Sequence, residues 1–131
     1  MNYCSYLAAD TTTNFPNFEV YSNVDPAREW NGTPTIEFNE PDDPKTTSTI
    51  SGAAIVTRSV YAIARTESCE DAETVLFELC ERCTKALDAL LKKGAIDAFA
   101  IDERGITADV RGIVEGESFY GYVKFLITER I

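Results

Sequence analysis

The sequence predicts an α+β fold, with a mixed or antiparallel sheet of about four to six strands and one long amphipathic helix packed on one face. Two observations lead to this prediction. Residues 68–93 combine a helix start signal, a periodic apolar face and a stop signal, and the flanking stretches contain runs with strand-like alternation. With 131 residues and 44% apolar content, the chain fits one domain spanning residues 1–131, large enough to bury a substantial core.

The long helix is delimited at both ends by residues with capping preferences. Ser68 and Asp71 have the spacing of a capping box, in which the serine hydroxyl accepts a hydrogen bond from the first turn. Lys92 and Lys93 place positive charge at the negative end of the helix dipole. Gly94 can adopt the left-handed conformation that ends a helix. We therefore predict one helix between Ser68 and Gly94.

The two sides of this helix differ in polarity. At 100° per residue its apolar side chains occupy an arc of roughly 160°, which we expect to be buried: Ala72, Val75, Leu76, Leu79, Cys80, Cys83, Leu87, Leu90 and Leu91. The opposite side carries acid-before-base pairs at i,i+4 spacing, which predict an ordinary solvated surface: Glu78–Arg82, Glu81–Lys85 and Asp88–Lys92. Nothing on that outer side indicates catalysis.

The front of the chain predicts one short helix and two short strands. Two helical turns are predicted within residues 1–10 from four apolar positions, Tyr3, Cys4, Leu7 and Ala8. Residues 18–21 form an apolar run that ends at Asn23, which predicts a short strand. Residues 33–40 alternate as a half-buried strand does, and Pro34 suits an edge strand or the first residue of a strand.

Residues 40–50 are rich in proline, acidic residues, threonine and serine. Such a segment buries too little apolar surface to offset the entropy of ordering it, so we predict a mobile acidic loop there. Residues 53–65 follow as a long run rich in β-branched side chains that is mostly apolar on both faces. We expect this run to be a central strand that feeds directly into the long helix.

The chain after the helix predicts further strands. Residues 95–101 read as a short strand and residues 102–105 as a polar turn. Residues 106–114 and 118–128 predict a hairpin joined at Glu115-Gly116.

Two tyrosines in the last predicted strand are candidates for a protein contact. Alternation places Tyr120 and Tyr122 on the side opposite to the apolar set of Phe119, Val123, Phe125 and Ile127. Two neighbouring outward aromatic residues are typical of an interface, and the alternative is ordinary surface.

Composition excludes several classes of function. Twelve Lys and Arg against 22 Asp and Glu give a net charge of −10, which argues against binding nucleic acid through a basic patch. The absence of histidine removes Ser-His-Asp and Cys-His nucleophiles and the commonest metal ligand. No apolar run approaches the ~18 residues of a membrane span and no signal-peptide pattern is present, so we expect an intracellular product that binds no membrane.

The cysteines and acid pairs do not indicate a metal or cofactor. Cys80 and Cys83 form a C-x-x-C motif on the apolar arc, well inside the helix, whereas a redox thiolate lies at a helix N-terminus. We interpret them as buried thiols, with Cys4 and Cys69 as the remaining residues that could complete a four-sulfur site. The acid pairs Asp42-Asp43 and Asp102-Glu103 lack calcium-loop spacing, which favours solvated loop charge.

Three stretches resemble the tail-terminator proteins of long-tailed bacteriophages. The first is a Thr-Pro strand at residues 33–38, followed by an acidic loop and a glycine that leads into the long strand at residues 52–65. The second is the acid-rich helix start with its alanine and leucine spacing, at residues 68–91. The third is the closing strand at residues 122–129. The N-terminal helix of that family is usually longer than residues 1–10 allow.

The resemblance implies a structural virion protein without catalytic activity. It implies a homohexameric ring that caps the tail tube, with one face on the tail-tube protein and the other on a head-completion (neck) protein. Such a protein would reside in the virion tail or neck, and in the host cytoplasm during assembly. DNA would only pass through the channel, without specific binding and without a cofactor.

The acidic loop supplies the candidate residues for that channel. Because carboxylates repel phosphates, an acidic bore would let DNA slide without sticking. We expect Glu40, Asp42 and Asp43 to face the lumen or a neighbouring subunit. The alternative is that the loop is outer solvated surface.

Two other classes of function remain open on the sequence alone. A small-molecule-binding or enzymatic α+β domain would need an apolar pocket, with Arg58 and Arg65 as natural anion ligands. An acidic regulatory interaction module would use the charge of −10 to occupy a nucleic-acid-binding protein. A hexameric size would separate the ring from both alternatives.

Overall fold

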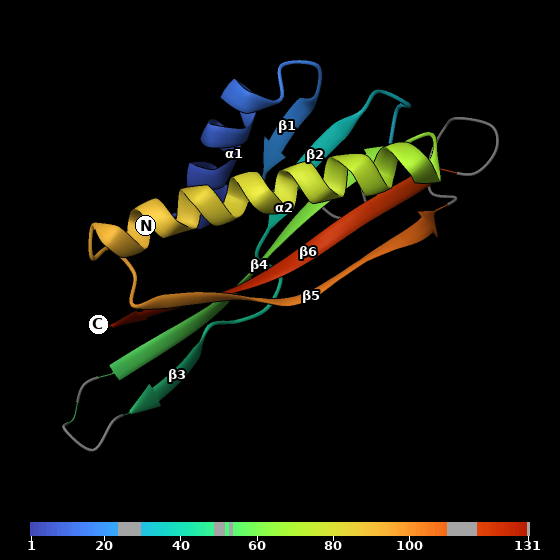
Figure 1. Ribbon diagram of the computed structural model, residues 1–131. Helices are drawn as coiled ribbons and strands as arrows, with labels where there is room; N and C mark the ends of the chain where they lie inside the picture. The colour runs from blue at the N-terminus through green and yellow to red at the C-terminus, as the bar shows by residue number, and fades with distance from the viewer. Residues whose placement is uncertain (24–29, 49–51, 53, 110–117, 131) are drawn as a thin grey trace.

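The computed structural model describes residues 1–23, 30–48, 52, 54–109 and 118–130. The described chain forms two helices and six strands in the order α1 (Tyr3–Asn14), β1 (Glu19–Ser22), β2 (Thr35–Asn39), β3 (Lys45–Ser48), β4 (Ala54–Thr66), α2 (Cys69–Lys92), β5 (Ala98–Asp109) and β6 (Ser118–Arg130). The strands form one sheet and the helices pack on it (Figure 1). The predicted α+β class is therefore confirmed.

The sheet is mixed, and its longest strands lie at its centre. Its order is β1-β2-β4-β6-β5, and β3 also pairs with β4, beyond the part that pairs with β2. Only β1 and β2 run parallel among the described pairs; the others are antiparallel. The long strand predicted at residues 53–65 is β4, which pairs with β6 over almost its whole length. Its central position explains why both of its faces are mostly apolar.

The long helix begins and ends where its capping residues predict. The Ser68 hydroxyl accepts a hydrogen bond from the Asp71 amide at 3.1 Å, which satisfies one donor of the first turn. After the helix, Gly94 has a φ of +75°, the left-handed conformation that favours glycine. Every residue predicted for the apolar arc is buried except Leu91, which is half-buried.

The helix lies close to β6 because the sheet offers a glycine at the contact. Val123, Phe125 and Ile127 of β6 are fully buried beneath α2. A Cβ atom added at Gly121 would lie 3.0 Å from the Leu76 Cβ and 3.2 Å from the Ala72 carbonyl oxygen. The absence of a side chain there sets the separation of helix and sheet.

The first helix is longer than predicted and packs on the same side as α2. It begins at an Asn2 cap, whose side chain accepts a hydrogen bond from the Ser5 amide at 3.1 Å, and runs three turns instead of two. Its Asp10 forms an ion pair with Arg82 of α2, with hydrogen bonds of 2.7 and 2.9 Å. The prediction of a Glu78–Arg82 pair was therefore wrong, because the Arg82 guanidinium binds Asp10 of α1 instead.

The other two surface pairs of α2 are confirmed. Lys85 lies 3.6 Å from Glu81, and Lys92 lies 2.9 Å from Asp88. All four side chains are largely exposed, so each pair contributes at most a few tenths of a kcal/mol.

Three predictions about strands need correction. Residues 102–105 were predicted to form a polar turn, but they lie inside β5. A β-bulge between Ile101 and Glu103 leaves Asp102 without a paired residue in the register with β6, and the strand continues beyond it. The predicted loop at residues 40–50 contains β3, whose polar residues pair with the start of β4. The five residues of β2 are all buried, so this strand is covered on both faces and is not half-buried. The predicted turn at Glu115-Gly116 lies outside the described residues.

Candidate protein-interaction site

The face of the sheet opposite to the helices brings together side chains from four strands. We call it the open face. Register places three cross-strand rows on it: Asn39–Tyr61–Lys124–Glu103, Glu37–Ile63–Tyr122–Gly105 and Thr35–Arg65–Tyr120–Thr107. These residues alternate with the core residues of the same strands. Tyr120 and Tyr122 therefore point away from the helices, as the sequence predicts.

The two predicted tyrosines form a connected pair on the open face. Their ring centroids are 6.3 Å apart, and both residues are half-buried. The Tyr122 hydroxyl donates a hydrogen bond of 2.8 Å to Glu103, and this bond is the main cause that raises the pKa of Tyr122. Gly105 lies beneath the ring, since a Cβ atom added there would be 3.3 Å from it. Glycine and tyrosine thus form a cross-strand pair in which the ring covers the strand backbone.

A third tyrosine extends this cluster. Lys124 lies 5.7 Å from the ring centroid of Tyr61, within cation–π range, and 3.2 Å from Asp102. The hydrogen bond with Asp102 is the main cause that raises the pKa of Lys124. The Tyr61 hydroxyl is 3.4 Å from Asp42. The open face therefore combines three aromatic rings with one ion pair and with two carboxylates that accept hydrogen bonds from tyrosine hydroxyls. Aromatic residues are enriched at protein interfaces.

One edge of the open face is buried under the chain itself. Trp30 is fully buried, and its indole N–H donates to the Thr33 carbonyl at 2.5 Å and to the Thr35 hydroxyl at 3.2 Å. Glu37 and Arg65 are buried in the same region and lie 3.7 Å apart. These residues stabilise β2 against β4 and leave the tyrosines as the accessible part of the face.

The acidic candidates separate to the two sides of the sheet. Asp42 lies beside Tyr61 on the open face, and Asp43 is exposed. Glu40 turns to the helix side, where it accepts a hydrogen bond of 3.1 Å from Arg58. Glu40 is thus ion-paired within its own chain, whereas Asp42 and Asp43 are exposed and form no ion pair with the described residues.

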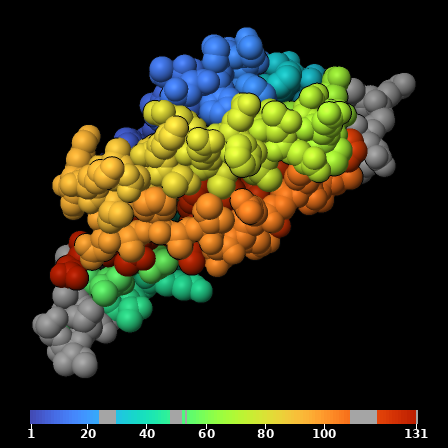
Figure 2. All heavy atoms as spheres, in the orientation of Figure 1, coloured from blue at the N-terminus to red at the C-terminus, as the bar shows by residue number. Residues whose placement is uncertain are grey.

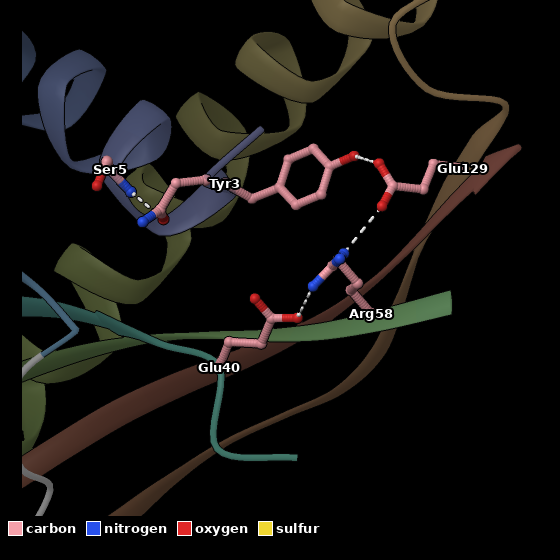
Figure 3. Close-up of polar contacts among 6 residues, drawn as sticks. Tyr3, Ser5, Glu40, Arg58 and Glu129 are labelled. Carbon is pink, nitrogen blue, oxygen red and sulfur yellow. Dashed lines mark hydrogen bonds and ion pairs between the residues drawn. The ribbon is translucent and has the colours of Figure 1, made fainter. Parts of the chain in front are cut away.

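Arg58 joins Glu40 to a network that ties the first helix to the last strand (Figure 3). Its Nε donates a hydrogen bond of 2.9 Å to Glu129, and the Tyr3 hydroxyl donates to the other oxygen of the same carboxylate. The hydrogen bond from Tyr3, followed by that from Arg58, holds the pKa of Glu129 below its ordinary value. Burial, with the bond to Glu129, raises the pKa of Tyr3. The network is partly buried and holds α1, β4 and β6 together.

The two arginines proposed as anion ligands do not converge. Alternation along β4 places Arg58 on the helix side and Arg65 on the open face. Each also lies next to a carboxylate of the same chain, Glu129 and Glu37 respectively. A single anion cannot contact both guanidinium groups, which weakens the small-molecule alternative.

Three of the four cysteines belong to the core. Cys4, Cys80 and Cys83 are buried, and burial raises the pKa of the Cys4 thiol to about 11 and that of Cys83 further. Cys69 is exposed at the start of α2, eleven residues and roughly 16 Å from Cys80 at the helical rise. It cannot join the other thiols around one ion. Among the described residues no group of three or more potential ligands could hold a metal.

Neither helix in the described part of the chain is long and apolar enough to cross a membrane. Comparison of the chain with protein-family models and with curated proteins finds no match.

A second exposed apolar feature lies away from the open face, on the outer side of α2. Phe77 lies outside the predicted apolar arc of α2, and its side chain is 70% exposed. The sequence does show a large apolar residue among charged neighbours on the outer side of a helix, which is typical of a contact surface. Its exposure, however, depends on how much of α2 the sheet covers.

Proposed function

We propose that this protein is a structural virion subunit that acts as a tail terminator. In this role six copies form a ring that caps the tail tube and joins it to a head-completion protein, with a channel for DNA. The protein has no catalytic role in this proposal and requires no cofactor. It resides in the virion tail or neck after assembly in the host cytoplasm.

The open face is the observation that best supports a role in assembly. It presents Tyr61, Tyr120 and Tyr122 beside Lys124, which is already paired with Asp102, so a partner can cover the rings without leaving that lysine unpaired. The three sequence stretches that resemble tail terminators lie on β2, β4, α2 and β6, which are the elements that build the sheet and its helical layer. The proposal therefore draws on the same elements as the resemblance.

The net charge fits passage of DNA through such a ring. Asp42 and Asp43 are exposed beyond the end of β2 and belong to a chain with a charge of −10. We propose that these two carboxylates face the bore or a neighbouring subunit. Glu40 contributes less to the field of the channel, because it forms an ion pair with Arg58.

Size and tube binding test the proposal. Light scattering coupled to gel filtration should give six times the 14.5 kDa chain mass, or the chain should form such rings on purified tail tubes under the electron microscope. A double variant, Tyr120→Ala with Tyr122→Ala, should keep its fold and lose binding to a protein partner. A monomer that binds neither tubes nor neck proteins would contradict the proposed function.

The bore has its own test. Asp42→Lys with Asp43→Lys should leave the ring intact and make it retain DNA at low salt, because lysines hold phosphates through counterion release. The matched control is Glu70→Lys on the exposed first turn of α2. Equal DNA retention by both variants would place the two aspartates outside the bore.

A further inference from the structure

On the side of α2 that faces β5, the exposed Phe77 lies beside apolar residues that are buried or half-buried. Phe77 has the largest exposed fraction, 70%, among the large apolar side chains of the described residues. It borders a groove of about 400 Å³ that runs between α2 and β5, with Leu76 and Ile106 in its lining and Arg104 at its rim. We call these four residues the Phe77 strip. Figure 2 shows β5 lying along this side of α2.

The opposite side of α2 borders a cavity of similar size. This cavity has a volume of about 420 Å³ and lies between the start of α2 and the N-terminal strands. Phe18, Pro34 and Val75 give it apolar walls, and Glu67 and Asp71 add two exposed carboxylates. We call it the Glu67 cavity.

The Phe77 ring suits the cavity in size, and Arg104 suits it in charge. Glu73 lines the same groove as these two residues. A cavity of about 150 Å³ accommodates a benzene ring in a well-studied engineered protein, so 420 Å³ leaves room for the Phe77 ring and part of its surroundings. Within the described residues, Arg104 forms no ion pair, and neither do Glu67 and Asp71. Bringing the strip to the cavity would place the arginine beside the two acids.

The two features cannot meet within one chain, because α2 lies between them. We propose that the Phe77 strip of one copy docks into the Glu67 cavity of the next copy. The contact joins two different surfaces, so it is head-to-tail, and repetition of such a contact produces a ring when the rotation closes. This inference rests on the proposed ring and names the surfaces that build it.

The experiment uses two full-length variants that each disable one surface. Phe77→Asp places a charge in the strip, and Thr74→Trp fills the cavity from an exposed position in its lining. Each variant alone should shift the mass from the assembled ring to the 14.5 kDa monomer with an unchanged circular dichroism spectrum. Glu78→Ala, on the solvated side of α2, is the matched control and should assemble normally.

Mixing the two variants identifies the contact as head-to-tail. The Phe77→Asp chain keeps a working cavity and the Thr74→Trp chain keeps a working strip, so an equimolar mixture should give a discrete heterodimer and nothing larger. The charge pair is tested separately: Arg104→Glu should disrupt assembly, and Glu67→Arg with Asp71→Arg in the same chain should restore it.

The outcomes separate this inference from the proposed function. A ring of six that survives Phe77→Asp, or a mixture that stays monomeric, overturns the inference and leaves the proposed function standing. An assembly that is not hexameric but depends on both surfaces supports the inference and overturns the ring of six. A wild-type chain that remains monomeric at millimolar concentration and forms no ring on tail tubes overturns both the docking and the ring. Where rings form only on tubes, Phe77→Asp should abolish them, and rings that persist overturn the inference alone.

Discussion

Gly121, Val123 and Phe125 of β6 pack beneath α2, whereas their immediate neighbours Tyr122 and Lys124 lie on the open face. The helix side is stabilised by apolar burial and close packing, so an added atom or charge there lowers the stability of the fold. The open face is held by cross-strand pairs between half-exposed side chains, each of which contributes a fraction of a kcal/mol. The same strand therefore carries stability on one face and remains available for contacts on the other.

The largest effect is expected from a charge in the buried arc. Leu79→Asp or Leu87→Asp places a carboxylate at a position with no exposure, at a cost of several kcal/mol against a total stability of roughly 5–15 kcal/mol. We expect loss of soluble, folded protein, measured by expression and thermal melting. Glu81→Ala on the outer side should change stability by less than about 0.5 kcal/mol. Equal tolerance of the two kinds of change would contradict the orientation of α2.

A matched pair of glycine substitutions compares the faces directly. Gly121→Ala forces a Cβ atom against Leu76 and the α2 backbone and should cost about 1–3 kcal/mol. At Gly105 the atoms nearest to an added Cβ belong to the Tyr122 side chain, which is half-exposed and can shift, so Gly105→Ala should change stability by less than about 0.5 kcal/mol. Urea unfolding of both variants measures the difference. A larger loss at Gly105 would reverse the assignment of the two faces.

The network of Tyr3, Arg58 and Glu129 should make stability depend on pH. Because the folded pKa of Glu129 lies below its ordinary value of 4.5, its stabilising effect is present above that pH and is lost as the pH falls through the lowered pKa. Glu129→Gln should reduce stability near pH 7 by about 1 kcal/mol and flatten the acid limb of the stability profile. Melting temperatures between pH 7 and pH 3 measure this. Glu73→Gln, an exposed control, should keep the steeper acid limb of the wild type.

The smallest effect is expected on the open face. Tyr122→Phe removes only the hydroxyl that donates to the exposed Glu103, so stability should change by less than about 0.5 kcal/mol. Glu103→Gln should lower the pKa of Tyr122 towards its ordinary value, because the bond to the carboxylate is the main cause of the rise. Spectrophotometric titration in a background with the other tyrosines changed to phenylalanine measures it. An unchanged pKa would show that the hydroxyl does not bond to Glu103 in solution.

The sequence by itself determined the features that depend on local spacing. The bounds of α2 follow from Ser68 and Gly94, its buried side follows from a period of 3.6 residues, and the outward position of Tyr120 and Tyr122 follows from a period of two. These features are predictable because backbone geometry alone fixes which neighbouring residues share a face.

Only the tertiary structure decided which distant groups meet. A polar run at residues 102–105 resembles a turn until β6 provides Lys124 and Tyr122 as cross-strand partners. Arg82 has an acid one turn away, yet it pairs with Asp10 of α1. The exposure of Phe77 likewise depends on how much of α2 the sheet covers. In each case a local contact competes with a contact formed by a segment far away in the sequence. The packing of the folded chain decides which contact forms, and a short stretch of sequence holds no information about that packing.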